Sequence, residues 1–122
     1  MTLYTVKAYV NVGEDNFHGL KPRDPIALVD EFAISDESPE CAAHTMWIIG
    51  NRMGDDIGYV GKPYPRDVRS LSVGDLISVK DDRSMTFFAV DRADFTVIPE
   101  PANPIVELAG SKATSRPAGI TP

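Results

Sequence analysis

Two residues suited to nucleophilic and proton-transfer chemistry, Cys41 and His44, lie close together near the middle of the 122-residue chain. In a helix, residues three apart share a face, so the imidazole could accept the thiol proton. A position near a helix N-terminus also favours the thiolate. No third group is evident, however, and the intervening Ala42 and Ala43 suggest a packed surface. Because free cysteine commonly serves as a small buried hydrophobe, we favour a structural Cys41 and expect no catalytic residue.

The residue types that ligate metals are sparse. Two histidines and one cysteine make the usual four-ligand zinc site improbable. The pairs Asp55-Asp56 and Asp81-Asp82 could each touch a cation, but neither has the spacing of a calcium loop. The sequence also lacks a phosphate-cradling glycine loop and a dinucleotide fingerprint. We therefore predict neither a metal nor a cofactor, and interpret the aspartate pairs as solvated turns.

The most distinctive stretch, RSLSVGDLISV, begins at Arg69. Gly74 lies where the chain must turn sharply, because only glycine adopts a positive φ without steric cost. Asp75 can hydrogen-bond the neighbouring backbone and fix that turn. Ser70 and Ser72 are possible nucleophiles, but no nucleophile-elbow pattern surrounds either residue. We interpret both hydroxyls as groups that close the loop onto the start of a strand.

Three short apolar runs follow this turn, at residues 76–79, 86–90 and 95–98. Polar clusters at 81–84 and 91–94 separate them. Short runs rich in β-branched and aromatic residues with tight polar separators are typical of consecutive antiparallel strands. The second half of the chain is therefore predicted to form a compact β-meander.

The elements that precede the meander are expected to cover it. Leu3 to Val12 alternates apolar and polar residues, as in a half-buried strand. Ile26 to Ile34 fits either a short helix with Pro25 at its first position or a strand whose apolar face is interrupted only by Asp30. The period-two pattern favours the strand, and the helix is the alternative.

One helix is predicted between these strands and the meander. Ser38 is a natural N-cap and Pro39 fits the first helical position. The apolar stripe at helical spacing predicts a helix that runs to about Met53. Gly54 is expected to cap its C-terminus, and Trp47 to be its central packing anchor.

A long glycine- and proline-containing connection covers residues 55–67. Loops of this length inside a domain are often functional, although aromatic residues in them also serve to pack the loop onto the body. This loop supplies two tyrosines and two cations, and the motif that follows supplies four further polar residues. The predicted binding residues are Tyr59, Lys62, Tyr64, Arg66, Arg69, Ser70, Ser72 and Asp75.

The run from Arg69 to Asp75 resembles the RSLSVGD signature of the YodL-like group, and the chain is similar to a wider set of small actinobacterial and phage- or plasmid-encoded proteins. Trp47 and Asn51, spaced as Trp-x-x-x-Asn in the predicted helix, also fit that set. The resemblance covers about two thirds of the chain. It implies a phage or mobile-element context and no catalytic residues. Asp94 stands before Phe95 where the group usually has glycine, which puts the type of the last turn in doubt.

From Pro99 onward the chain is rich in proline and in small polar residues. This composition predicts an extended or disordered arm over residues 99–122, attached to a single domain over residues 1–98. Ile105, Val106 and Leu108 form a short apolar patch in that arm. We expect them to mediate self-association or partner contact by adding to a sheet edge or a groove.

Composition narrows the classes of function. Acidic residues outnumber basic ones, 18 to 12, for a net charge of −6, which argues against binding driven by phosphate neutralisation. One cysteine, no signal-peptide pattern and no membrane-length apolar run predict a cytoplasmic protein, in the host cytoplasm if phage-encoded.

Together these observations predict an α+β fold: a mostly antiparallel, barrel-like sheet of about five strands with one amphipathic helix packed on it. The predicted function is a non-enzymatic protein-interaction module of a phage, plasmid or other mobile element. The alternative is a small-ligand or nucleic-acid-binding domain, by analogy with small barrels that bind RNA.

Overall fold

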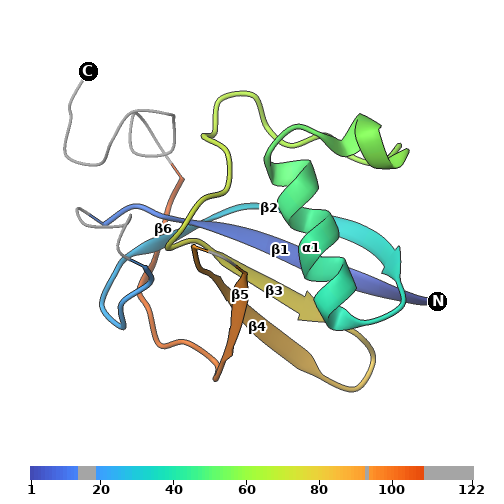
Figure 1. The fold of residues 1–122 in the computed structure, drawn as a ribbon. Helices are drawn as coiled ribbons and strands as arrows, with labels where there is room; N and C mark the ends of the chain where they lie inside the picture. Colours follow the sequence, from blue (N-terminus) through green and yellow to red (C-terminus); the bar gives the residue numbers. More distant parts are fainter. Residues whose placement is uncertain (14–18, 93, 109–122) are drawn as a thin grey trace.

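The computed structural model describes residues 1–13, 19–92 and 94–108. The fold is α+β, as predicted: a curled, mixed sheet with one helix across it (Figure 1). Its strands are β1 (Thr2–Asn11), β2 (Ile26–Asp36), β3 (Leu76–Lys80), β4 (Met85–Val90), β5 (Phe95–Ile98) and β6 (Ile105–Val106). The helices are α1 (Pro39–Gly50) and the short 3-10 helix η2 (Gly54–Ile57).

The sheet has the order β5-β4-β3-β1-β2-β6. All of its pairs are antiparallel except β2 with β6, which is parallel. β5 and β6 lie at opposite edges, yet Ile98 and Ile105 are only seven residues apart in sequence. In a flat sheet the two edges would be about 24 Å apart, and seven residues reach at most about 25 Å when fully extended. The short connection therefore fits a sheet curled into a half-barrel far better than a flat one.

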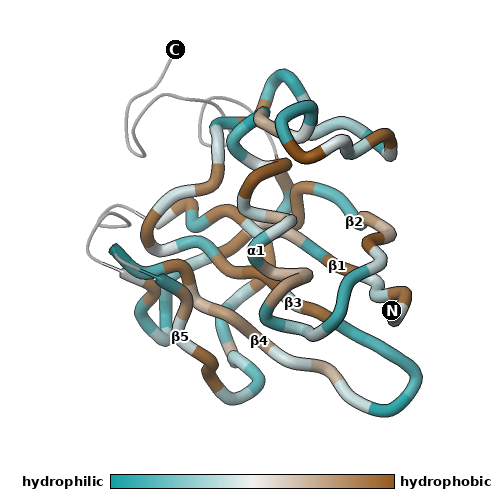
Figure 2. Tube along the Cα trace, turned by 45° about the vertical axis from the view of Figure 1, so that its right-hand side comes forward, coloured by the Kyte–Doolittle hydropathy of each residue, from teal (hydrophilic) through white to brown (hydrophobic). Residues whose placement is uncertain are grey.

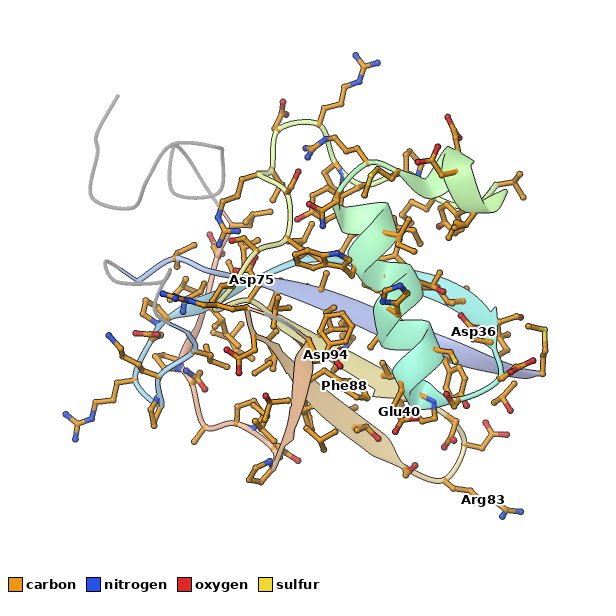
Figure 3. The ribbon with its side chains drawn as sticks, viewed as in Figure 1. Asp36, Glu40, Asp75, Arg83, Phe88 and Asp94 are labelled. Atoms are coloured by element: carbon orange, nitrogen blue, oxygen red, sulfur yellow. The ribbon has the colours of Figure 1, made fainter. Side chains whose placement is uncertain are left out.

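The main core lies between the concave side of the sheet and α1. Alternate residues of β1 point into it, and all are buried: Tyr4, Val6, Ala8 and Val10. The helix contributes Ala42, Ala43, Met46 and Ile49, each at most 2% exposed. Small alanines let the helix axis approach the strands closely, and Phe88 of β4 lies beneath the helix (Figure 3).

The strand interpretation of residues 26–34 is confirmed, because β2 pairs with β1 along its whole length. A register shift opposite Ala8 and Tyr9 marks a bulge in this pairing. The bulge lies next to Asp30, the residue that interrupts the apolar pattern of this strand. Beyond it the alternation resumes, with Phe32 and Ile34 buried on the core side.

The predicted helix is too long at its C-terminus. It begins at Ser38 as expected, where the Cys41 N–H donates to Ser38 Oγ at 3.1 Å. It ends at Gly50, because Arg52 adopts a left-handed conformation with φ 62°. The Arg52 N–H then donates to Ile49 O and the Met53 N–H to Ile48 O, as in a Schellman motif.

Three further predictions about α1 are corrected. Gly54 does not cap α1 but opens η2. Trp47 is only half-buried, with its ring in edge contact with Phe95 of β5, so Met46 and Ile49 are the central anchors instead. Cys41 is exposed rather than buried, because the first turn of α1 faces solvent on that side.

The sheet has one more strand than predicted. Residues Ile105 and Val106, assigned from the sequence to the C-terminal arm, form β6 and pair with Ile26 and Ala27. Leu108 is partly buried and packs against the core. Among residues 1–13, 19–92 and 94–108, no helix is long and apolar enough to span a membrane.

Candidate functional site

The two ends of the RSLSVGD motif form a buried ion pair. The Arg69 guanidinium donates from Nη1 to Asp75 Oδ2 at 2.7 Å and from Nη2 to Asp75 Oδ1 at 2.6 Å. The side chain of Asp75 is fully buried and that of Arg69 is 10% exposed. Asp75 lies where the motif loop enters β3 (Figure 3). A bidentate pair in this setting fixes the geometry of the loop.

The remaining bonds of this pair tie the motif to β1. Asp75 also accepts the backbone N–H groups of Asn11 and Ser72, both at 2.8 Å. Arg69 donates to Asn11 O at 3.0 Å. The Asn11 amide continues the network by donating to Asp24 Oδ2 and Gly74 O. We call the five residues Asn11, Arg69, Ser72, Gly74 and Asp75 the motif network.

Burial raises the pKa of the Asp75 carboxyl, and the Arg69 guanidinium with the N–H groups of Asn11 and Ser72 opposes that rise. Burial also works against the charged form of Arg69, but hydrogen bonding and the charge of Asp75 outweigh it, so the pKa of Arg69 is raised. Each partner of Asp75 is an N–H donor, and a carboxylate accepts all of them. The network therefore stabilises the turn and offers no free nucleophile.

Both motif serines accept hydrogen bonds from arginines. Ser70 Oγ accepts from Arg52 Nη1 at 2.7 Å, and Ser72 Oγ accepts from Arg69 Nη1 at 3.3 Å. Leu71 between them is 1% exposed, and its N–H donates to Gly50 O at 3.1 Å. The motif therefore binds the end of α1 to the start of β3.

Arg52 clamps the loop that connects η2 to the motif. Its Nη2 donates to Pro65 O at 3.0 Å and to Val68 O, and its guanidinium lies 5.2 Å from the centre of the Tyr64 ring. The buried Tyr64 hydroxyl donates to Arg69 O at 2.9 Å. Sequence reasoning missed Arg52, since nothing in the local pattern marks an arginine that caps a helix and binds distant carbonyls.

Tyr59 and Lys62 fix the outer part of this loop. The Tyr59 hydroxyl donates to Lys62 O at 2.7 Å. A Cβ added at Gly61 would lie 2.5 Å from the Tyr59 hydroxyl oxygen, so a larger residue there would have to displace the tyrosine ring. Lys62 Nζ pairs with Asp30 at 3.0 Å and donates to Glu31 O at 3.0 Å, which fastens the loop to β2.

The loop encloses a hollow of about 720 Å³ at the C-terminal end of α1. Three of the predicted binding residues, Tyr59, Tyr64 and Arg66, line it together with Arg52 and Asp55. Lys62 lies outside this lining; Arg69 and Asp75 form the buried pair, and Ser70 and Ser72 lie partly exposed in the motif loop. The predicted site thus divides into a surface part and an internal part.

Three apolar side chains between the end of α1 and this loop are exposed. Val60 is 97% exposed, and Met53 and Ile57 are each 46% exposed. Figure 2 shows hydrophobic stretches in this loop, which projects beyond the end of α1. We call Met53, Ile57 and Val60 the apolar loop surface. A count of apolar residues outside the predicted strands and helix would have found Ile57 and Val60, but not Met53, which was assigned to the predicted helix.

The other chemistry-bearing residues, Cys41 and His44, lie on α1, and His44 lines one groove together with Ile57. Cys41 and His44 have no hydrogen bond to each other, and the His44 ring contacts Phe95. In the part of the chain that the structure describes, no three histidine, cysteine or acidic residues are arranged to hold a metal ion.

Comparisons with protein-family models, with curated proteins and with solved structures found no match to this chain.

Proposed function

We propose that the chain is a non-enzymatic protein-interaction module and that the apolar loop surface is its main contact. The observation that carries this proposal is the near-complete exposure of Val60 in a segment of the chain where Met53 and Ile57 are also exposed. Exposed apolar side chains that gather in one place mark interaction sites more often than scattered ones do.

The bonds of the loop support a prearranged contact. Arg52, at the end of α1, donates to the carbonyls of residues 65, 66 and 68 in the inner part of the loop and to Ser70 Oγ, and Lys62 holds the outer part to β2. A loop already fixed in its binding conformation loses less entropy when a partner binds. The net charge of −6 also favours a protein partner over nucleic acid.

The role within a phage, plasmid or other mobile element is part of this proposal and is supported by the resemblance of the RSLSVGD motif. A cytoplasmic location is also part of this proposal and is supported by the single cysteine, which fits a reducing compartment. The small-ligand alternative is favoured by one observation, the 720 Å³ hollow beneath the loop, which has the size of ligand pockets.

The test is a quantitative affinity capture from the cell extract of the host, with the parent chain and Val60→Asp as baits. Val97→Thr is the matched control, because Val97 is a 59% exposed valine on β5, away from the loop. We expect at least one protein to be captured by the parent and by Val97→Thr, to be lost with Val60→Asp, and to bind the purified parent directly. Equal capture by all three baits would contradict the proposal.

A further inference from the structure

β2 has a free edge over most of its length. Its 11 residues pair with β1 on one side, but on the other side only Ile26 and Ala27 pair with β6. On this second side, the residues from Leu28 to Asp36 have no neighbouring strand in the part of the chain that the structure describes. Unpaired edges of this kind are templates for the addition of another strand.

The side-chain bonds at Glu31 reveal which backbone groups face outward. The Glu31 N–H donates to Asp30 Oδ1, and Glu31 O accepts from Lys62 Nζ. Because the N–H and C=O of one residue point to the same side of a strand and alternate along it, Ala33 and Ser35 also face the free edge. Both residues are exposed, and no partner for their backbone groups is present among the described residues.

A groove accompanies this part of the edge. It has a volume of about 430 Å³ and is bounded by residues 33–36 of β2. Ile48 of α1 forms its opposite wall, and Ile57 and Tyr59 close its end. Thr45 Oγ1 donates to Asp36 Oδ2 at 2.7 Å, which fixes the helix against the end of the strand. Figure 3 shows Asp36 at this end of β2, beside the helix.

We propose that an extended basic peptide of a partner protein adds to the β2 edge at Ala33 and Ser35 and places an apolar side chain in the groove between Ile48 and Ile57. This is the strand-addition mode of recognition, in which main-chain bonds supply affinity and alternate side chains supply specificity. The inference rests on the proposed function, since it names the partner class of the same module.

Two observations support this occupant. The chain already uses the edge in this way, because its own segment Ile105–Val106 adds to Ile26 and Ala27. The charge is complementary to a basic segment as well. Asp30 and Glu31 are paired with Lys62 and Lys7, but Asp36 and Glu37, beside Ser35 at the end of the edge, have no ion pair among the described residues.

The test uses a fluorescein-labelled synthetic peptide of alternating isoleucine and lysine, titrated with the full chain and followed by anisotropy and by amide NMR spectra. We expect the Ala33 and Ser35 amide signals to shift and become protected from exchange, while that of Ile26 stays unchanged. A peptide of alternating isoleucine and glutamate should bind about tenfold more weakly, because like charges oppose its approach.

Ala33→Pro removes one outward N–H and leaves the bonds to β1 intact, so we expect about a three- to tenfold loss of affinity for the lysine peptide. Val97→Thr, on the other edge, should bind like the parent. Unchanged Ala33 and Ser35 signals at millimolar peptide, equal binding of the acidic peptide, or a concentration-dependent dimer that blocks the edge would each overturn the proposal.

The failures of the two proposals are distinguishable. Loss of partner capture with Val60→Asp but no peptide binding would leave the protein-interaction function and remove the edge site. Peptide binding at Ala33 and Ser35 with capture indifferent to Val60→Asp would leave the edge site and remove the loop contact.

Discussion

Replacing Asp75 with asparagine should destabilise the fold strongly. The carboxylate accepts four N–H groups, two from Arg69 and one each from Asn11 and Ser72. The asparagine side chain has one acceptor oxygen where the carboxylate has two, and its NH₂ group would face another N–H donor. The charge of Arg69 would then lack its counter-charge, although the side chain is only 10% exposed. Breaking a buried pair on one side typically costs about 3–5 kcal/mol, against a total of about 5–15 kcal/mol for a domain.

The assay is urea unfolding, followed by the fluorescence of Trp47, the single tryptophan. The midpoint should fall with an unchanged slope, which indicates lost stability rather than a changed unfolded state. At about 4 °C per kcal/mol for a chain of this size, Tm should fall by about 10–20 °C. Arg69→Met combined with Asp75→Asn should be less destabilising than the sum of the single changes.

The matched control is the exposed ion pair between Lys62 and Asp30. Its N–O distance, 3.0 Å, is also short, but the two side chains are 50% and 37% exposed. Lys62→Met should therefore cost less than about 1 kcal/mol, and added salt should reduce the effect. If Asp75→Asn lowers the free energy of unfolding no more than Lys62→Met does, burial does not decide the strength of these ion pairs and the reasoning is wrong.

Three further changes test other parts of the structure. Gly50→Ala should destabilise by about 1–3 kcal/mol in urea unfolding, because the new Cβ would lie 2.4 Å from Leu71 Cδ1; a stabilised variant would contradict this packing. Burial raises the pKa of Tyr64, with the charge of Asp75 adding to the rise; stability should therefore fall as pH rises above about 10, where the unfolded chain loses that proton. Tyr64→Phe should flatten this alkaline decline, and an unaltered pH profile would refute it. Asn103→Ala should cost about 1–2 kcal/mol, because its amide donates to Lys21 O at 2.7 Å and to Asp24 O at 2.9 Å; an unchanged midpoint would mean that the arm does not brace the 21–25 turn.

Local patterns in the sequence were sufficient for most elements. Period-two alternation identified β1 and β2, and the Ser38-Pro39 start identified α1, because strand faces and helix caps depend on neighbouring residues only. The same patterns located the Gly74-Asp75 turn, where Gly74 has φ 94°. They could not predict the helix end, since Arg52 adopts its left-handed conformation while bonded to three carbonyls and a serine hydroxyl 13 to 18 residues away.

The tertiary structure alone decided what the motif residues do. Arg69 and Asp75 are six residues apart and look equally suited to a binding surface, but β1 lies over them and Asn11 completes their bonds. Likewise, Ile105 and Val106 read as part of a free arm, because a two-residue strand has no periodicity to detect. Their pairing with β2 depends on the curl of the whole sheet, which brings its two edges within reach of one short connection.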